Sequence, residues 1–110
     1  MNSELLKDRK KLMTLMKNSD PFFEEFGGLD DKAFSQGAIS KKHKELTMVS
    51  ISIVQKCEEC IIYHLGECLN HNATREEILD AVKIGMMSSG STSYPYGRLA
   101  FSFLHDNKIL

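Results

Sequence analysis

The chain has 110 residues, a formal net charge of −1 and a hydrophobic content of 42%. This composition is typical of one globular domain, and it provides no excess of Lys and Arg to neutralise nucleic-acid phosphates. The opening MNSELLKDRKKLMTLMKNSD mixes charges with Leu and Met, so it predicts neither a secretory signal nor a membrane span. We expect one cytosolic domain over residues 1–110, with no nucleic-acid or membrane partner. A chain this small leaves apolar surface uncovered, which favours self-association.

The first third of the chain predicts two helices and a loop. Residues 3–17 place apolar side chains on one face and charged ones on the other, a helical period. Asp20 and Pro21 are typical of an N-cap followed by the first residue of a second, short helix. We expect that helix to end at Gly27–Gly28 and a loop to follow as far as Ser40.

The remainder is mostly helical in pattern, except that residues 47–54 are ambiguous. A helix beginning KKHKEL is expected, but the stretch TMVSISIVQ alternates in a way that suits a half-buried strand equally well. Thr74 and Glu77 form a capping box ahead of a helix that ends at Gly90, and residues 94–104 predict a last helix. The chain therefore indicates an all-α fold of five or six helices around one core, with a possible exception at the ambiguous stretch.

All three cysteines fall within KCEECIIYHLGECLNH, residues 56–71. On a helix, five side chains of this segment form one stripe: Cys57, Cys60, His64, Cys68 and His71. An odd number of thiols without a secretory signal favours redox or metal chemistry over a structural disulfide framework. The stripe spans about 21 Å of helix, so at most three of its side chains could converge on one ion. A closed structural zinc site needs four ligands, which makes redox chemistry the better interpretation.

A redox pair of Cys57 and Cys60 requires a particular local geometry. On a regular helix, Cβ atoms at this spacing are about 5–6 Å apart, whereas a disulfide needs about 3.5–4.5 Å. The pair must therefore lie in a distorted or opening turn. At a helix N-terminus the backbone N–H groups would favour a thiolate at Cys57, while the charges of Glu58 and Glu59 would act against it.

A base for this chemistry is available at His64, one turn after Cys60 on the same face. If the preceding helix turns back near residue 56, Glu45 lies beside His64 and can orient the imidazole. Each residue also has a structural interpretation, because buried cysteines are common small hydrophobes. The stripe's Cys68 is interpreted as core, and His71 as a solvated helix end.

These residues resemble the signature of the carboxymuconolactone decarboxylase superfamily, in particular its alkylhydroperoxidase-D-like branch. The signature is a glutamate, eleven residues, Cys-x-x-Cys, three residues and a histidine. Here it reads Glu45, Cys57, Cys60 and His64. The resemblance covers residues 37–87. It implies an all-helical fold, with residues 47–54 helical, that assembles into homo-oligomers, usually trimers or hexamers.

The resemblance further implies a thiol peroxidase or disulfide oxidoreductase that acts on alkyl hydroperoxides or disulfides. Cys60 would supply the attacking thiolate and Cys57 the resolving thiol, which also relays a proton, while Glu45 and His64 activate the pair. An external dithiol, in some relatives a lipoyl group, would then reset the disulfide. No metal or other cofactor is implied.

Other functions stay open at this point. The best-known members of the branch carry a histidine just before the second cysteine, where this chain has Glu59, and this bears on the efficiency of peroxide reduction. A carboxymuconolactone decarboxylase-type enzyme, an oxidant sensor on the same fold and a metal-binding module are alternatives. A thioredoxin-like protein is the structural alternative, since a strand over residues 47–54 leading into Cys-x-x-Cys would suit that fold.

Overall fold

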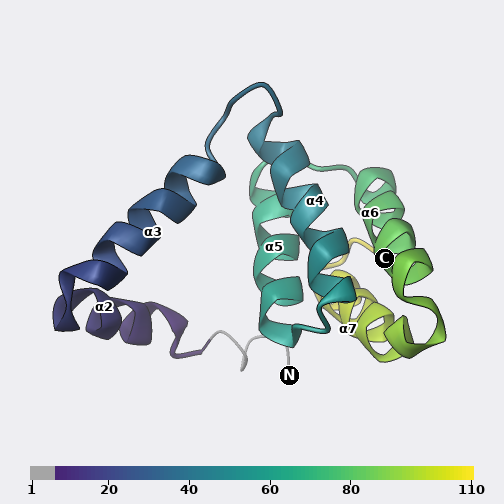
Figure 1. Cartoon of the computed structure of the whole chain (residues 1–110). Helices are drawn as coiled ribbons and strands as arrows, with labels where there is room; N and C mark the ends of the chain where they lie inside the picture. Colours follow the sequence, from purple (N-terminus) through teal and green to yellow (C-terminus); the bar gives the residue numbers. More distant parts are fainter. Residues whose placement is uncertain (1–6) are drawn as a thin grey trace.

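A computed structural model describes residues 7–110, which form helices and no strand (Figure 1). The all-α prediction is confirmed. The elements are α2 (Arg9–Ser19), α3 (Pro21–Ala33), α4 (Lys41–Val54), α5 (Glu58–Asn70), α6 (Arg75–Ser89), the 3₁₀ turn η1 (Gly90–Ser93) and α7 (Tyr94–Asp106). Within residues 7–110, no helix has the length and apolar character needed to cross a bilayer.

Carboxylate and hydroxyl side chains cap the starts of α3, α4 and α6, and the caps of α3 and α6 are the residues that the sequence predicts. Asp20 accepts a hydrogen bond from the backbone two residues on, and Ser40 accepts one from the backbone of His43. Thr74 accepts from the backbone N–H of Glu77, whose carboxylate accepts from the Thr74 N–H in return, which completes the capping box. These bonds satisfy N–H groups that have no partner inside the helix.

Two sequence predictions of helix limits need correction. The helix that begins at Pro21 does not end at Gly27–Gly28 but continues to Ala33. Neither glycine has a positive φ, and glycine costs only about 1 kcal/mol relative to alanine inside a helix, so nothing stops the helix there. The first helix of the described residues, α2, runs two residues past its predicted end; the start of that prediction, residues 3–6, lies outside the described residues.

Residues 47–54, whose pattern suits a strand and a helix equally well, are helical, as the family resemblance implies, and the strand alternative is wrong. The buried positions of α4 follow a helical rather than an alternating period: Glu45, Leu46, Val49, Ser52 and Ile53. Ile51, which the alternation would have placed with Val49 and Ile53 inside the core, is 38% exposed. Burial on one helical face therefore outweighs the β-branched pattern.

The core lies among α4, α5, α6 and α7, with α4 between α5 and α6. Gly85 of α6 permits the closest approach to α4, because a Cβ there would stand 2.8 Å from the Ser50 carbonyl oxygen. The Ser50 hydroxyl also donates to the Ala81 carbonyl at 2.7 Å. The face of α4 turned to α6 is thus fixed by backbone contact, and the opposite face meets α5.

The helical pair α2–α3, which we call the N-terminal arm (Arg9–Ala33), stands away from this bundle (Figure 1). Neither helix contains a buried residue. The arm instead exposes a set of large apolar side chains: Leu12, Met13, Leu15, Met16, Phe22, Phe23, Phe26 and Leu29.

Candidate active site

The turn between α4 and α5 positions the cysteine pair. Lys56 adopts a left-handed backbone with φ 57°. Its N–H donates to the Ile53 carbonyl, and the Cys57 N–H donates to the Ser52 carbonyl, the two hydrogen bonds of a Schellman motif. Cys57 then becomes the N-cap of α5 with an extended backbone. The opening turn that the cysteine spacing required is therefore present.

Cys57 and Cys60 are joined by a disulfide, with their Cα atoms 5.2 Å apart. Both residues are partly exposed. The Cys60 N–H donates to the Cys57 sulfur at 3.2 Å, so the first turn of α5 directs a backbone donor at the pair. When the disulfide is reduced, this donor and the helix dipole favour a thiolate at the same place.

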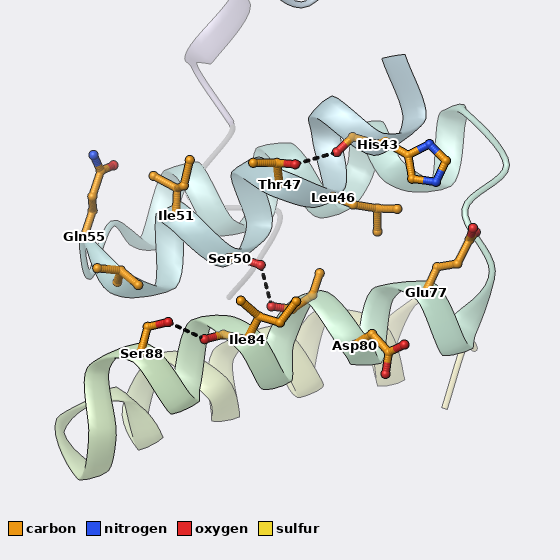
Figure 2. A pocket seen from close by; sticks show the side chains of 12 residues that line it. His43, Leu46, Thr47, Ser50, Ile51, Gln55, Glu77, Asp80, Ile84 and Ser88 are labelled. Carbon is orange, nitrogen blue, oxygen red and sulfur yellow. Dashed lines mark hydrogen bonds between the residues drawn. The ribbon is translucent and has the colours of Figure 1, made fainter. Parts of the chain in front are cut away.

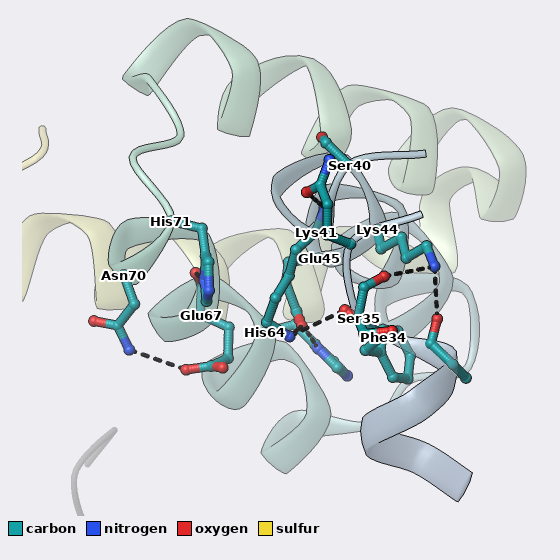
Figure 3. A network of polar contacts seen from close by, with 12 residues as sticks. Phe34, Ser35, Ser40, Lys41, Lys44, Glu45, His64, Glu67, Asn70 and His71 are labelled. Atoms are coloured by element: carbon teal, nitrogen blue, oxygen red, sulfur yellow. Dashed lines mark hydrogen bonds and ion pairs between the residues drawn. The ribbon is translucent and has the colours of Figure 1, made fainter. Parts of the chain in front are cut away.

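Glu45 and His64 meet between α4 and α5, as predicted. Glu45 Oε1 lies 2.6 Å from His64 Nδ1, and the two residues are only 2% and 9% exposed (Figure 3). A carboxylate only accepts hydrogen bonds, so Nδ1 carries the proton of this contact. In the neutral ring, Nε2 is then the basic nitrogen. Across the described residues, no hydrogen bond joins His64 to either cysteine in the disulfide form.

Lys41 is a third charged residue of this site and contacts the Glu45 carboxylate. Lys41 Nζ lies 3.2 Å from Glu45 Oε2 and also donates to the Phe34 carbonyl at 3.2 Å. Both oxygens of the buried carboxylate are thereby paired, and the Phe34 ring lies 5.8 Å from the His64 ring. Lys41 is not among the site residues that the sequence predicts. Its position four residues before Glu45 on a helix was the signal that could have identified it.

Arg9 brings the N-terminal arm to the site. Its guanidinium lies 2.9 Å from Glu59 and 3.9 Å above the Tyr63 ring, which in turn lies edge-on to His64 with centroids 5.0 Å apart. Burial and then the charge of Glu67 raise the pKa of Tyr63. Arg9 offsets the negative charge that Glu59 places beside the cysteines. No sequence signal links two residues so far apart in the chain.

The rest of the stripe stays outside this arrangement. Cys68 is fully buried, and burial, followed by the charges of Glu45, Glu67 and Glu77, raises its pKa to about 12. It is therefore a thiol at neutral pH and an unreactive part of the core. His71 Nδ1 lies 2.9 Å from the Glu67 carbonyl, so this residue packs on its own helix end. In residues 7–110, no three His, Cys, Asp or Glu side chains are grouped to hold a metal ion.

A separate groove of about 700 Å³ lies on the other side of α4, between α4 and α6 (Figure 2). Ile51 and Ile84 line it, together with Leu46 and Val54, so its walls are largely apolar. None of the four signature residues lines this groove. It is therefore distinct from the cysteine site.

Two known proteins are similar in sequence to this chain. The chain is 27% identical over 78 residues to an uncharacterized protein of Cupriavidus necator, covering 71% of this chain and 69% of that one. It is 26% identical over 83 residues to an uncharacterized protein of the cox locus of Paracoccus denitrificans, covering 76% and 75%.

Two solved structures share the fold. A carboxymuconolactone decarboxylase family protein of Thermotoga maritima is 30% identical to this chain with a TM-score of 0.88, covering 96% of this chain and 90% of that one. That protein is described as possibly involved in an antioxidative response. An apo family member from Legionella pneumophila is 27% identical with a TM-score of 0.86, covering 96% and 95%. The family model described as carboxymuconolactone decarboxylase matches residues 20–101. The chain therefore belongs to the carboxymuconolactone decarboxylase family.

Proposed function

We propose that this protein is a thiol-dependent peroxidase or disulfide oxidoreductase that reduces alkyl hydroperoxides through Cys57 and Cys60. The observation that carries the proposal is the buried Glu45–His64 hydrogen bond on the helix pair that also holds the partly exposed disulfide. A base oriented by a carboxylate, close to a cysteine pair at a helix N-terminus, is the arrangement that activates a thiol. The name of the Thermotoga maritima relative supports the same direction.

The cycle begins with the reduced pair. His64 Nε2 takes the thiol proton, directly or with Cys57 as the relay, and Cys60 becomes a thiolate. The thiolate attacks the outer peroxide oxygen, the O–O bond breaks, and the proton passes to the departing alkoxide, which leaves as an alcohol. Cys60 is now a sulfenic acid.

The second half returns the disulfide. The Cys57 thiol attacks the Cys60 sulfenic acid, the S–O bond breaks, and water leaves with the proton of the thiol. An external dithiol, such as a lipoyl group, then reduces the disulfide by thiol exchange and is itself oxidised to a disulfide. Glu45 remains a carboxylate throughout and stabilises the positive charge that His64 acquires when it holds the proton.

Turnover of cumene hydroperoxide by metal-free protein with dihydrolipoamide tests the proposal. Wild type and the Cys68→Ser control are expected to turn over, because Cys68 lies in the core, whereas Cys60→Ser is expected to be inactive. Equal turnover in wild type and Cys60→Ser contradicts the peroxidase assignment, and so does a wild type that shows no turnover while its Cys57 and Cys60 thiols remain titratable. Reduction of a small disulfide substrate under the same conditions then separates a disulfide oxidoreductase from a protein with neither activity.

We also propose that the protein works as a homo-oligomer, a trimer or hexamer, in which a second copy covers the N-terminal arm. Neither helix of the arm contains a buried residue, and the large apolar side chains of Phe22, Phe26 and Leu29 are each at least 60% exposed. So many exposed large apolar side chains on one pair of helices are unusual on a monomer. The apolar groove between α4 and α6 is a second uncovered surface of the same kind (Figure 2).

Light scattering coupled to size exclusion measures this assembly. Wild type is expected to have the mass of three or six chains, and the double variant Phe26→Asp, Leu29→Asp a lower mass. Phe101→Asp, at an exposed apolar position of α7, is the matched control and should keep the wild-type mass. A monomeric wild type, or an arm variant with unchanged mass, contradicts the proposal.

A further inference from the structure

One buried hydroxyl at the base of the cysteine turn has no partner. Ser52 is completely buried, and its Oγ is the one buried side-chain nitrogen or oxygen of residues 7–110 without a hydrogen bond. Hydroxyls inside helices ordinarily donate to a carbonyl one turn back, as Thr47 does to His43 at 2.8 Å. A buried polar group left without a partner lowers stability, and a hydrogen bond formed in another state of the protein would offset that cost.

The turn geometry shows which group can provide that bond. In the Schellman motif that ends α4, the hydrogen bond that spans the larger number of residues runs from the Cys57 N–H to the Ser52 carbonyl, at 3.1 Å. The side chains at these two positions of the motif frequently touch. The motif therefore favours a position of the Ser52 side chain next to that of Cys57.

The pairing of α4 with α5 gives the same placement independently. Glu45 and His64 are opposite each other in this antiparallel pair. Ser52 stands seven residues after Glu45 on α4, and Cys57, the N-cap of α5, stands seven residues before His64, so the two residues lie at the same end of this helix pair. The unpartnered hydroxyl and the catalytic relay thus share one face of α4, with the relay at one end and the cysteine pair at the other.

We propose that Ser52 is a positioning residue whose hydroxyl donates a hydrogen bond to the Cys57 sulfur in the reduced protein. This inference rests on the proposed redox function of the pair. In the disulfide form, the bond to Cys60 holds the Cys57 sulfur, and Ser52 Oγ has no partner. Reduction by an external dithiol adds two electrons and two protons to the pair, breaks the S–S bond and frees the Cys57 side chain to turn.

Once free, the Cys57 sulfur is a hydrogen-bond acceptor, most strongly as a thiolate. The Ser52 hydroxyl thus stabilises the dithiol form and does nothing for the disulfide form. The expected consequence is a less negative reduction potential, so the pair is more easily reset by its dithiol reductant.

The test is the thiol–disulfide equilibrium of Cys57 and Cys60 in dithiothreitol redox buffers. Ser52→Ala is expected to disfavour the reduced form about tenfold, which is about 30 mV for a two-electron couple. Ser52→Thr keeps a hydroxyl and should restore most of the change. Ser50→Ala is the matched control, because the Ser50 hydroxyl is bonded to Ala81 on the side of α4 away from the cysteines.

Thermal unfolding in the two redox states separates this role from a structural one. Ser52→Ala should leave the oxidised protein as stable as wild type or more so, and should destabilise the reduced protein. An unchanged equilibrium, or an equal loss of stability in both states, overturns the inference. Neither measurement uses peroxide, so a failure of peroxide turnover and a failure of this inference are distinguishable.

Discussion

Replacing Glu45 with glutamine perturbs the proposed relay at its centre. The change keeps the shape of the side chain but removes the charge that lies 2.6 Å from His64 in a buried setting. A hydrogen bond to a charged group contributes about 1.5–3 kcal/mol. In Glu45→Gln, the steps in which His64 is positively charged lose the stabilisation that the carboxylate provides. Because about 1.4 kcal/mol corresponds to a tenfold change in rate, turnover should fall between about tenfold and 150-fold.

The assay is steady-state hydroperoxide turnover, together with alkylation of the reduced pair by iodoacetamide, which reports thiolate formation without peroxide. Glu67→Gln is the control, since Glu67 contacts Asn70 on the exposed side of α5. Circular dichroism of both variants establishes that they are folded. If Glu45→Gln is folded and both rates stay within twofold of wild type, the relay assignment is refuted.

Three further changes test the surrounding structure. Lys41→Met removes a part-buried ion pair with Glu45 and should lower turnover about fivefold, whereas Lys42→Met should leave it unchanged; equal effects would contradict a specific role for Lys41. Gly85→Ala forces a Cβ against the backbone of α4 and should destabilise the protein by about 1–3 kcal/mol in thermal unfolding, a loss that looser packing would not give. The Cys68 thiol ionises near its usual 9.0 in the unfolded chain and near 12 in the folded one. As pH rises, the unfolded chain therefore loses this proton first, and stability should fall by about 1 kcal/mol between pH 9 and 10. Denaturant unfolding should show that this slope is missing in Cys68→Ala; an identical slope in that variant would place its origin elsewhere.

Much of the helical layout could be read locally. The N-caps at Asp20, Ser40 and Thr74 depend on side chains within three residues, and so they were predictable. The Glu45–His64 contact followed from a reversal near residue 56 and the rise of a helix. Local rules failed where tertiary burial decides, as in residues 47–54, whose helical face is defined by α5 and α6 rather than by β-branched residues.

Contacts between distant parts of the chain could not be read from the sequence. Arg9 reaches Glu59 and Tyr63 only because the N-terminal arm folds back towards α5, and no spacing rule predicts that path. The helical period also could not predict that the apolar face of the arm is exposed, because the same pattern fits a helix that packs on the core of its own chain. Ser52 gave no signal, because a buried hydroxyl becomes informative only once its neighbours are known.

In the proposed function, the Cys57–Cys60 pair itself reduces the peroxide. The most direct measurement mixes fully reduced, metal-free protein with one equivalent of cumene hydroperoxide per chain in the absence of any reductant. The products are quantified as alcohol by chromatography and as cysteine pairs by peptide mass spectrometry. We expect one alcohol and one Cys57–Cys60 disulfide per chain, formed together, with Cys68 still a free thiol. Intact peroxide beside an unoxidised pair, or alcohol formed without that disulfide, would contradict the proposed function.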